Sequence, residues 1–275
     1  MKPTAKSLVL DLLLAADGGS LSAHEAVRCG ALFDITANNV RVTLVRLGSE
    51  GLIEAAGRGS YRLGPAAQDL AGEVATWRSA EQRVRRWNGG YIAVHCAGLG
   101  RSDRAALKRR QRALQMLGFR EYEGALYLRP DNIERDLDAV RQRLVTLGLE
   151  PHAPVFLASA FGPRQLTQIE RLWDRKALEA SYHKLQKRLH DWIERSDGLD
   201  RDIAAREAFL IGGAAIRQLV FDPLLPAPMI DVDARQAFVE TVHRFDACGR
   251  KIWAQLYRSA LPTTVSSKAK RARRA

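Results

Sequence analysis

The chain has 275 residues, 46% of them hydrophobic, and a formal net charge of +12 at pH 7. This length exceeds that of one ordinary domain and predicts two or three domains, each able to bury a core. No stretch reaches the roughly 18 consecutive apolar residues of a membrane span, and the N-terminus lacks a hydrophobic signal followed by a cleavage site. We therefore expect a soluble cytoplasmic protein that does not contact a membrane.

The positive charge is concentrated in two places. Residues 78–120 contain eleven Arg and Lys but only two acids, and residues 268–275 add five more cations. The positive electrostatic field of these residues favours a polyanionic partner, although a basic stretch taken alone is often only a solvated face.

The cysteines and histidines do not predict a metal site. Cys29, Cys96 and Cys248 are isolated and odd in number, which suggests neither a disulfide framework nor a zinc ribbon. The six histidines form no HExxH or HxxxH pair. We expect no metal and no resident cofactor.

Two helices are expected at the start of the chain. Residues 4–16 form an apolar segment that ends before Asp17-Gly18-Gly19. Ser22 and Glu25 have the spacing of a capping box, which would open a second helix that runs to about Gly30.

The most informative segment, residues 35–63, has the pattern of a recognition helix followed by a two-stranded wing. Thr36 is placed to cap a helix over residues 37–49, in which apolar residues recur at helical spacing on one face. The opposite face carries hydrogen-bonding and small apolar side chains suited to base edges in a major groove. Its residues are Asn38, Asn39, Arg41, Val42, Val45, Arg46 and Ser49.

Two short strands are expected after this helix, at residues 52–54 and 60–63. They enclose Gly57-Arg58-Gly59, a hairpin tip that would hold a cation toward a phosphate or a minor groove. Three helices and a hairpin within about 65 residues predict a winged helix-turn-helix that binds double-stranded DNA. The expected DNA-binding residues are Thr36, Asn38, Asn39, Arg41, Val42, Arg46, Arg58 and Ser60.

A helical linker and an alternating α+β segment are predicted next. Residues 66–86 are helix-forming and lead to Trp87-Asn88-Gly89-Gly90, a natural boundary. The following pattern is β-α-β-β-α-β if residues 120–122 supply a strand or a bend, which suggests a ferredoxin-like sandwich. The other strands are expected at 91–96, 125–129 and 155–158, and the helices at 102–117 and 132–147.

Beyond Gly162-Pro163 the sequence turns almost wholly helical, with helices expected at 165–195, 200–220 and 233–259. The last residues, 263–275, have no apolar periodicity and predict a disordered basic tail. The whole chain is thus predicted to be a multidomain α+β protein. Its parts are a winged helix-turn-helix domain (1–65), a linker helix (66–86), a ferredoxin-like α/β sandwich (87–162), an all-helical domain (163–262) and the tail (263–275).

Two patterns that imitate enzyme sites are rejected. Gly98-Leu-Gly100 follows a strand and opens a helix, but Asp103 replaces the third glycine of a dinucleotide loop and would repel a pyrophosphate. The first central strand ends in His95-Cys96-Ala97 without a carboxylate, so a metal nuclease stays only a remote alternative. We expect no catalytic residue and no enzyme activity.

Three segments resemble the PaaX-type transcriptional repressors of phenylacetate catabolism. The first runs from Val40 to Leu47, with Glu50-Gly51 and the Gly57-to-Tyr61 wing. The second is Leu126-Tyr-Leu-Arg129-Pro130-Asp131-Asn132, and the third is Asp222-Pro223-Leu224-Leu225-Pro226. Their order and spacing cover nearly the whole chain.

The resemblance implies a winged helix, a central Cas2-like ferredoxin domain and a helical C-terminal domain in a homodimeric repressor. That repressor would be released from its operator by an aryl-acyl-CoA effector such as phenylacetyl-CoA. Leu52 stands where the family commonly has Trp, and Thr43 stands where it often has Ala. These departures leave the operator sequence and the inducer open. The sequence also does not decide whether the protein represses or activates transcription.

An acyl-CoA site should pair cations with an apolar pocket. The candidates are Arg104, Lys108 and Arg109 on the basic helix and Trp173, Tyr182, Phe209 and Phe238 in the helical region. In the competing interpretation these aromatic residues are plain core and the basic helix lies along the DNA backbone. A second functional class also stays open, an architectural protein that binds nucleic acid without a ligand.

Overall fold

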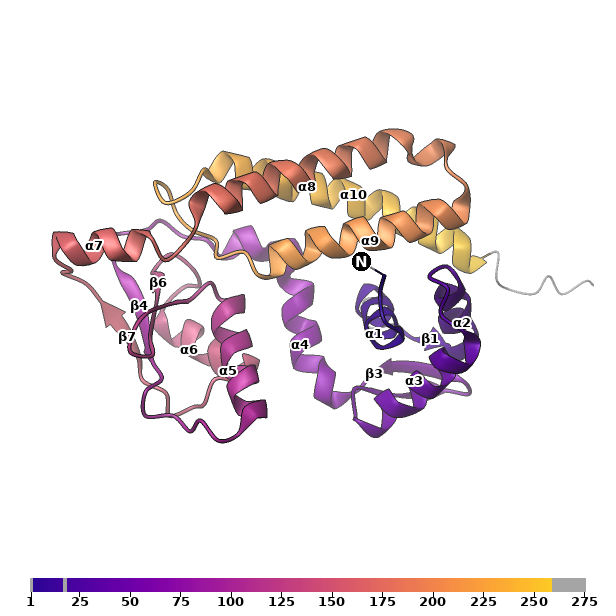
Figure 1. Cartoon of the computed structure of the whole chain (residues 1–275), viewed down its shortest axis with the longest axis horizontal. Coiled ribbons are helices and arrows are strands. Elements are labelled where there is room, and N and C mark those ends of the chain that lie inside the picture. The colour runs from indigo at the N-terminus through magenta and orange to yellow at the C-terminus, as the bar shows by residue number, and fades with distance from the viewer. Residues whose placement is uncertain (1, 17–18, 259–275) are drawn as a thin grey trace, which may run out of the picture.

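A computed structural model describes residues 2–16 and 19–258 and shows a mixed α+β protein with a C-terminal helical region (Figure 1). The basic tail expected at 263–275 lies outside the described residues. The N-terminal part contains α1 (Ala5–Ala15), α2 (Ala23–Ala31) and α3 (Ala37–Ser49). Its sheet has the order β1-β3-β2 and is antiparallel, with β1 (Leu21–Ser22), β2 (Ile53–Gly57) and β3 (Ser60–Leu63).

Local capping fixes where these helices begin. The Ser22 side chain accepts a hydrogen bond from the Glu25 backbone at 3.1 Å, and the Glu25 carboxylate accepts from the Ser22 backbone at 2.8 Å. The capping box expected from the sequence is therefore confirmed. The apolar faces of α1, α2 and α3 then pack into one core, in which Leu8, Val40 and Leu44 are buried.

The linker consists of two consecutive helical segments of different type. Residues Pro65–Ala75 are the α-helix α4, and Thr76–Arg83 continue as a tighter 3₁₀ segment that contains a kink at Ser79. The single helix expected over 66–86 is therefore wrong in its second half. Ion pairs fasten this half to the last helix, α10 (Val232–Arg258): Arg78 pairs with Asp246 at 3.2 Å and Glu81 with Arg235 at 2.9 Å.

The central part is a four-stranded antiparallel sheet in the order β5-β6-β4-β7 with two helices on one face. Residues 120–123, left open by the sequence as a strand or a bend, form a strand. The elements in chain order are β4 (Tyr91–His95), α5 (Arg104–Met116), β5 (Arg120–Glu123), β6 (Leu126–Pro130), α6 (Leu137–Leu147) and β7 (Val155–Ala158).

The side chains of β4 point alternately into two hydrophobic cores, so the strand is buried on both faces. Ile92 and Val94 pack against α5 and α6, whereas Tyr91 and Ala93 belong to the core of the C-terminal helices. Successive side chains of a strand point to opposite faces, so the sheet is covered on both sides.

Two helix boundaries differ from the sequence prediction. The helix expected from 132 begins only at Leu137, because Glu134 has a positive φ of 57° and the Asp136 side chain caps the helix. The helix expected over 165–195 is split into α7 (Pro163–Glu170) and α8 (Arg175–Arg195), since the Asp174 side chain accepts from the Ala177 backbone and starts a new helix. The bundle is completed by α9 (Arg201–Val220) and α10.

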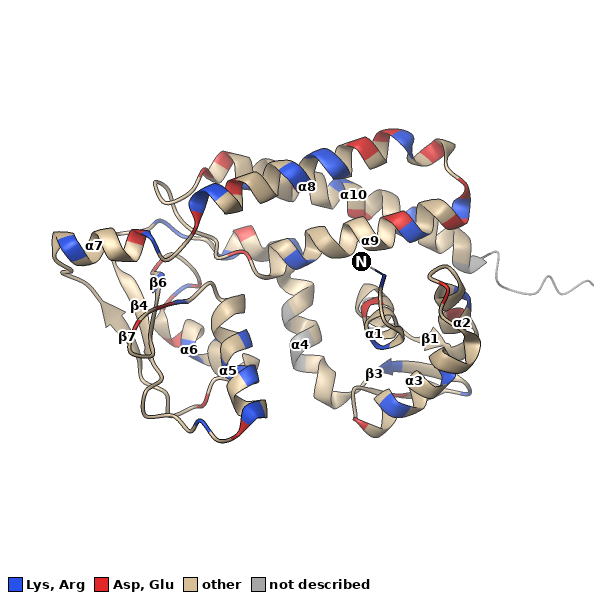
Figure 2. Ribbon diagram, viewed as in Figure 1, with Lys and Arg blue, Asp and Glu red and all other residues tan. Residues whose placement is uncertain are grey.

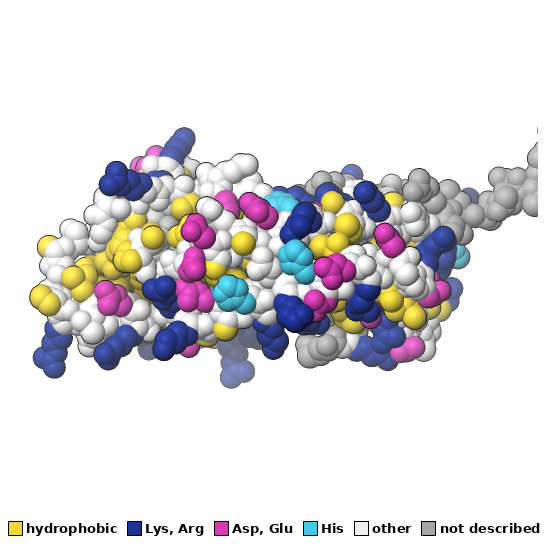
Figure 3. All heavy atoms as spheres, turned by 90° about the horizontal axis from the view of Figure 1, so that it is seen from above, with side chains coloured by type: hydrophobic (Ala, Val, Ile, Leu, Met, Phe, Trp, Pro, Cys, Tyr) yellow, Lys and Arg dark blue, Asp and Glu magenta, His cyan; other side chains and the backbone are white. Residues whose placement is uncertain are grey.

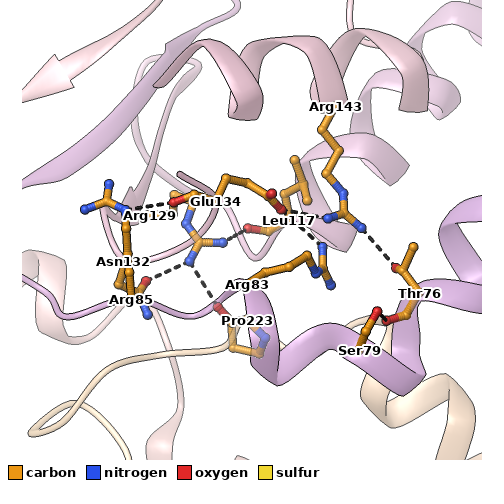
Figure 4. A network of polar contacts seen from close by, with 10 residues as sticks. All are labelled: Thr76, Ser79, Arg83, Arg85, Leu117, Arg129, Asn132, Glu134, Arg143 and Pro223. Atoms are coloured by element: carbon orange, nitrogen blue, oxygen red, sulfur yellow. Dashed lines mark hydrogen bonds and ion pairs between the residues drawn. The ribbon is translucent and has the colours of Figure 1, made fainter. Parts of the chain in front are cut away.

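A buried arginine joins the central sheet to the C-terminal helices (Figure 4). Arg129 on β6 is 1% exposed and donates hydrogen bonds to the carbonyls of Leu117, Pro130 and Pro223 and to the Asn132 side chain. Asn132 in turn donates to the Leu224 carbonyl at 2.7 Å. Two segments about ninety residues apart in the chain thus form one network, which we call the Arg129 network.

Burial lowers the pKa of the Arg129 guanidinium to about 9, against the opposing effect of nearby Asp131. The group therefore keeps its charge at neutral pH. A buried charge is tolerated only where its donors are satisfied, so these carbonyl contacts are necessary for the network.

Arg110 ties α5 to the loop that precedes it and to the loop between α6 and β7. Buried Arg110 donates from Nε to the Glu150 carboxylate at 2.9 Å and from Nη2 to the Gly100 carbonyl at 3.0 Å. The hydrogen bond from Arg110 holds the pKa of Glu150 below its ordinary value.

Within the described residues, no helix is both long and apolar enough to cross a membrane.

Replacement of the buried guanidinium should destabilise the protein strongly. Arg129→Met leaves the carbonyls of Leu117 and Pro223 without a donor, and we expect a loss of about 3 kcal/mol or more in the free energy of unfolding. Urea denaturation measures this loss. Arg135→Met is the matched control, because Arg135 is 80% exposed and forms a surface ion pair with Asp136. It should change stability by less than about 0.5 kcal/mol. Equal effects of the two substitutions would contradict the role of the network.

The ion pair of Arg110 and Glu150 should make stability depend on pH. The pKa of Glu150 is lowered in the folded state, so its stabilisation is present above the ordinary value of 4.5 and is lost as the pH falls through the lowered folded value. Glu150→Gln should therefore cost about 1–3 kcal/mol at pH 7 and progressively less below pH 4.5. Denaturation series of both proteins between pH 7 and pH 3 test this, and a constant difference would refute it.

Candidate nucleic-acid interface

One face of α3 is fixed in the core and the other is open to solvent. Val40, Leu44 and Leu47 are buried against α1 and α2, as the helical spacing predicts. The Thr36 hydroxyl accepts a hydrogen bond from the Asn39 backbone at 3.3 Å and caps the helix. The open face can therefore contact a partner without disturbing the packing of the helix.

The open face of α3 carries apolar as well as polar side chains. Val42 is 58% exposed and Val45 is 72% exposed, although valine is normally buried in the protein interior. Asn38, Asn39 and Arg41 are exposed beside them. Amide and guanidinium groups with small apolar side chains match the hydrogen-bonding edges and the thymine methyl groups of a major groove.

The cations near α3 differ in their partners. Arg46 donates from Nε to Glu50 at 3.2 Å but remains 77% exposed, and Lys6 donates to the same carboxylate at 2.6 Å. The hydrogen bond from Lys6 holds the pKa of Glu50 below its ordinary value. In the part of the chain that the structure describes, no carboxylate forms an ion pair with Arg41 or Arg58. These two cations keep their charge available for a phosphate.

The hairpin tip presents Arg58 to solvent. Gly57 has a φ of 145° and Gly59 a φ of 72°, which are backbone conformations that favour glycine. Arg58 is exposed between them, whereas Ser60 is half-buried and pairs with Ser22 of β1. Of the eight residues expected to bind DNA, Thr36 caps α3, Ser60 pairs in the sheet and Arg46 forms an ion pair with Glu50. The other five, Asn38, Asn39, Arg41, Val42 and Arg58, lie exposed on α3 or the tip.

The residues expected to bind an effector do not form one pocket. Trp173 is buried and donates to the Gly118 carbonyl at 3.0 Å, and buried Tyr182 donates to Asp222 at 2.6 Å. Burial raises the pKa of Tyr182.

The other candidates lie elsewhere. Phe209 packs on Phe33 of the N-terminal part, with ring centroids 5.1 Å apart, and Phe238 stacks on Tyr182 at 5.6 Å. The cations Arg104, Lys108 and Arg109 are exposed on α5. Buried aromatic rings and surface cations of this kind do not surround a common ligand.

A groove that the sequence reasoning missed lies between α5, β5, β6 and the end of α9. It has a volume of about 650 Å³ and combines aromatic side chains with one guanidinium, that of Arg120, whose pKa is lowered by burial. No local signal identified it, because its walls meet only after the sheet and the helices pack. The lining residues are Gln111, Leu114, Gln115, Phe119, Arg120, Glu121, Tyr127 and Phe221.

A second cavity, beside Arg129 and Asp222, has a volume of about 20 Å³, which is room for one water molecule. Among the described residues no three His, Cys, Asp or Glu side chains come together in a way that could hold a metal ion.

Comparisons with known proteins identify the helical region. Residues 173–255 match the family model described as PaaX-like protein C-terminal domain. No curated protein matched the chain. Among solved structures, the chain is similar to "Uncharacterized protein Rv0674 from Mycobacterium tuberculosis", with a TM-score of 0.59 and 23% sequence identity over 92% of this chain and 99% of that chain. At this identity the likeness shows the fold alone. The PaaX-like character expected from the sequence is confirmed by the family match for residues 173–255, which contain the third of the three segments, 222–226.

Proposed function

We propose that this PaaX-like chain is a transcriptional regulator, not an enzyme, and that it binds double-stranded DNA through α3 and the hairpin tip. The observation that carries the proposal is the exposure of Val42 and Val45 between Asn38, Arg41 and Arg46 on a helix whose other face is packed. Water solvates two exposed valines poorly, whereas a major groove offers them methyl groups and carbon edges. Arg58 would contact the phosphate backbone or a minor groove beside that helix.

The arrangement of elements supports finer assignments within this proposal. Helices α1 to α3 followed by the β2–β3 hairpin have the order of a winged helix-turn-helix. The antiparallel order β5-β6-β4-β7 with α5 and α6 on one face agrees with a ferredoxin-like sandwich. The proposed domains are thus the winged helix (1–65), the linker (66–86), the central sandwich (87–162) and the helical domain (163–262).

A homodimer would place two such helices on one operator. Two-fold symmetric recognition requires half-sites about 10 bp apart or a multiple of that spacing. We propose that the dimer acts as a repressor of aromatic-acid catabolic genes. Sedimentation of the protein on operator DNA would show one chain per half-site, and a single bound chain per operator would contradict the dimer.

Three substitutions test the DNA interface. Asn38→Ala and Arg46→Ala should each cost about 1–3 kcal/mol of specific binding, because each removes hydrogen bonds to base edges. Arg58→Ala should weaken binding to all sequences alike and reduce the slope of log K against log salt by about one, because it removes a phosphate contact. Fluorescence anisotropy with DNA from the region upstream of the gene measures both quantities.

Arg188→Ala provides the control for these variants, because Arg188 is exposed on α8, far along the chain from α3. It should bind like the wild type. Unchanged affinity in all three interface variants would overturn the proposed function.

The 650 Å³ groove favours a small-molecule effector, which we propose is an aryl-acyl-CoA. Arg120 can pair with an anionic group while Phe119, Tyr127 and Phe221 contact an apolar or aromatic one. Phe221 directly follows α9 and lies two residues before Pro223, whose carbonyl belongs to the Arg129 network. A ligand in the groove would therefore contact the junction between the central sheet and the helical region. If the ligand bound more tightly to one relative arrangement of these two parts, it would shift the DNA-binding equilibrium.

Calorimetric titration tests the effector site. Phenylacetyl-CoA should bind the wild type and lose about tenfold affinity in Arg120→Ala, which corresponds to about 1.4 kcal/mol. The Arg104→Ala/Arg109→Ala variant should bind the thioester like the wild type, which separates the groove from a phosphate site on α5. Free CoA and phenylacetate complete the series. If DNA affinity does not respond to any of these ligands, the architectural alternative is favoured over effector release.

A further inference from the structure

The helix α5 presents a row of cations that the fold does not use. Arg104 and Lys108 are exposed, and within the described residues neither has a carboxylate at ion-pair distance; the same holds for Arg101, just before the helix. Arg110, on the same helix, points inward and is satisfied by Glu150. The packing of α5 therefore uses Arg110, whereas Arg104 and Lys108 have no ion pair within the described residues.

The exposed face of α5 is polar along its length. Residues 104, 108, 111 and 115 share one face because they are three or four positions apart. They are Arg104, Lys108, Gln111 and Gln115, so the face carries cations and amides but no acid and no apolar side chain. The N-terminal half of this face, with Arg104 and Lys108, can bind phosphates electrostatically. Gln111 and Gln115, toward its C-terminal end, line the 650 Å³ groove.

The position of α5 relates this face to α3. Figure 2 marks several cations along the ribbon of α5, and in the view of Figure 1 α4 lies between α5 and the N-terminal part. The N-terminal end of α5 lies on the same side of the molecule as α3, away from α8 and α10 (Figures 1 and 2). The face formed by α8 and α10 differs, because Figure 3 shows Lys and Arg interspersed there with Asp and Glu.

We propose that α5 is a second, sequence-independent contact with duplex DNA. A duplex held by α3 and the hairpin tip would extend past α4, and its phosphates would meet Arg101, Arg104 and Lys108. This inference rests on the proposed function and adds to it: α3 reads the sequence, and α5 adds affinity and fixes the direction in which the duplex leaves the winged helix. Phosphate contacts position a protein on DNA in this way without reading bases.

DNA length provides the test. Two duplexes are compared, a short one that covers only the footprint of α3 and the hairpin tip, and a long one extended on both sides by about one helical turn of unrelated sequence. The variant Arg104→Ala/Lys108→Ala should lose about tenfold or more of its affinity for the long duplex. Its slope of log K against log salt should fall by about two, because two phosphate contacts are lost. Its affinity for the short duplex should equal that of the wild type.

The matched control is Lys184→Ala/Arg188→Ala on α8. It removes the same two residue types at the same four-residue spacing from an exposed helix. This variant should bind both duplexes like the wild type, and thermal melts should show both double variants folded.

The outcomes separate the two proposals. Arg46→Ala should weaken binding to both lengths, since it acts through α3. If Arg46→Ala behaves in this way while Arg104→Ala/Lys108→Ala binds the long duplex with wild-type affinity and salt slope, the second contact is overturned and the proposed function stands. If the wild type binds neither duplex, the proposed function fails and this inference fails with it. Equal losses in the α5 and α8 variants would also overturn the inference, because they would reflect net charge alone.

Discussion

The arrangement of the parts depends on one buried charge. Arg129 loses its hydration when it enters the interior, and the free energy is recovered only if the carbonyls of Leu117 and Pro223 and the side chain of Asn132 are all in place. These acceptors come from the end of α5, the segment after β6 and the segment after α9. The guanidinium is therefore satisfied only when the central sheet and the helical region are docked in one orientation.

Helix α9 extends this constraint to the N-terminal part. Its last residue precedes Phe221, which lines the 650 Å³ groove, and Phe209 on the same helix packs on Phe33 beneath α2 and α3. Phe221 follows Phe209 by twelve positions, which corresponds to about 18 Å at 1.5 Å per residue. A packed helix transmits displacement as a rigid element, so α9 offers a physical route by which an occupant of the groove could reposition α3.

The sequence predicted well those features that depend on local chemistry. The bounds of α3 follow from Thr36 and from the recurrence of Val40, Leu44 and Leu47, all within four turns. The order of the central strands and helices was likewise read from local patterns. The start of α6 could not be predicted in this way, because Glu134 adopts a left-handed conformation that glycine usually marks in a sequence. The effector candidates were chosen by residue type, yet Trp173 and Tyr182 are core residues, and only long-range packing decides that.

The two segments 126–132 and 222–226 were recognised from the sequence as separate motifs, and their contact explains why both carry polar residues. Removing one member of a buried polar network leaves its partners unsatisfied and destabilises the protein, whereas replacing all members together with packed apolar residues is often neutral or stabilising. A buried charge is therefore weak evidence that a network evolved for stability as such. The hydrogen bonds of the Arg129 network have fixed directions, whereas apolar contacts tolerate sliding. The proposed contact of α3 and α5 with one rigid duplex would set the separation of the two helices, and it would require a junction held by directional hydrogen bonds. We therefore expect the network to be needed for the geometry of DNA binding as much as for the stability of the fold.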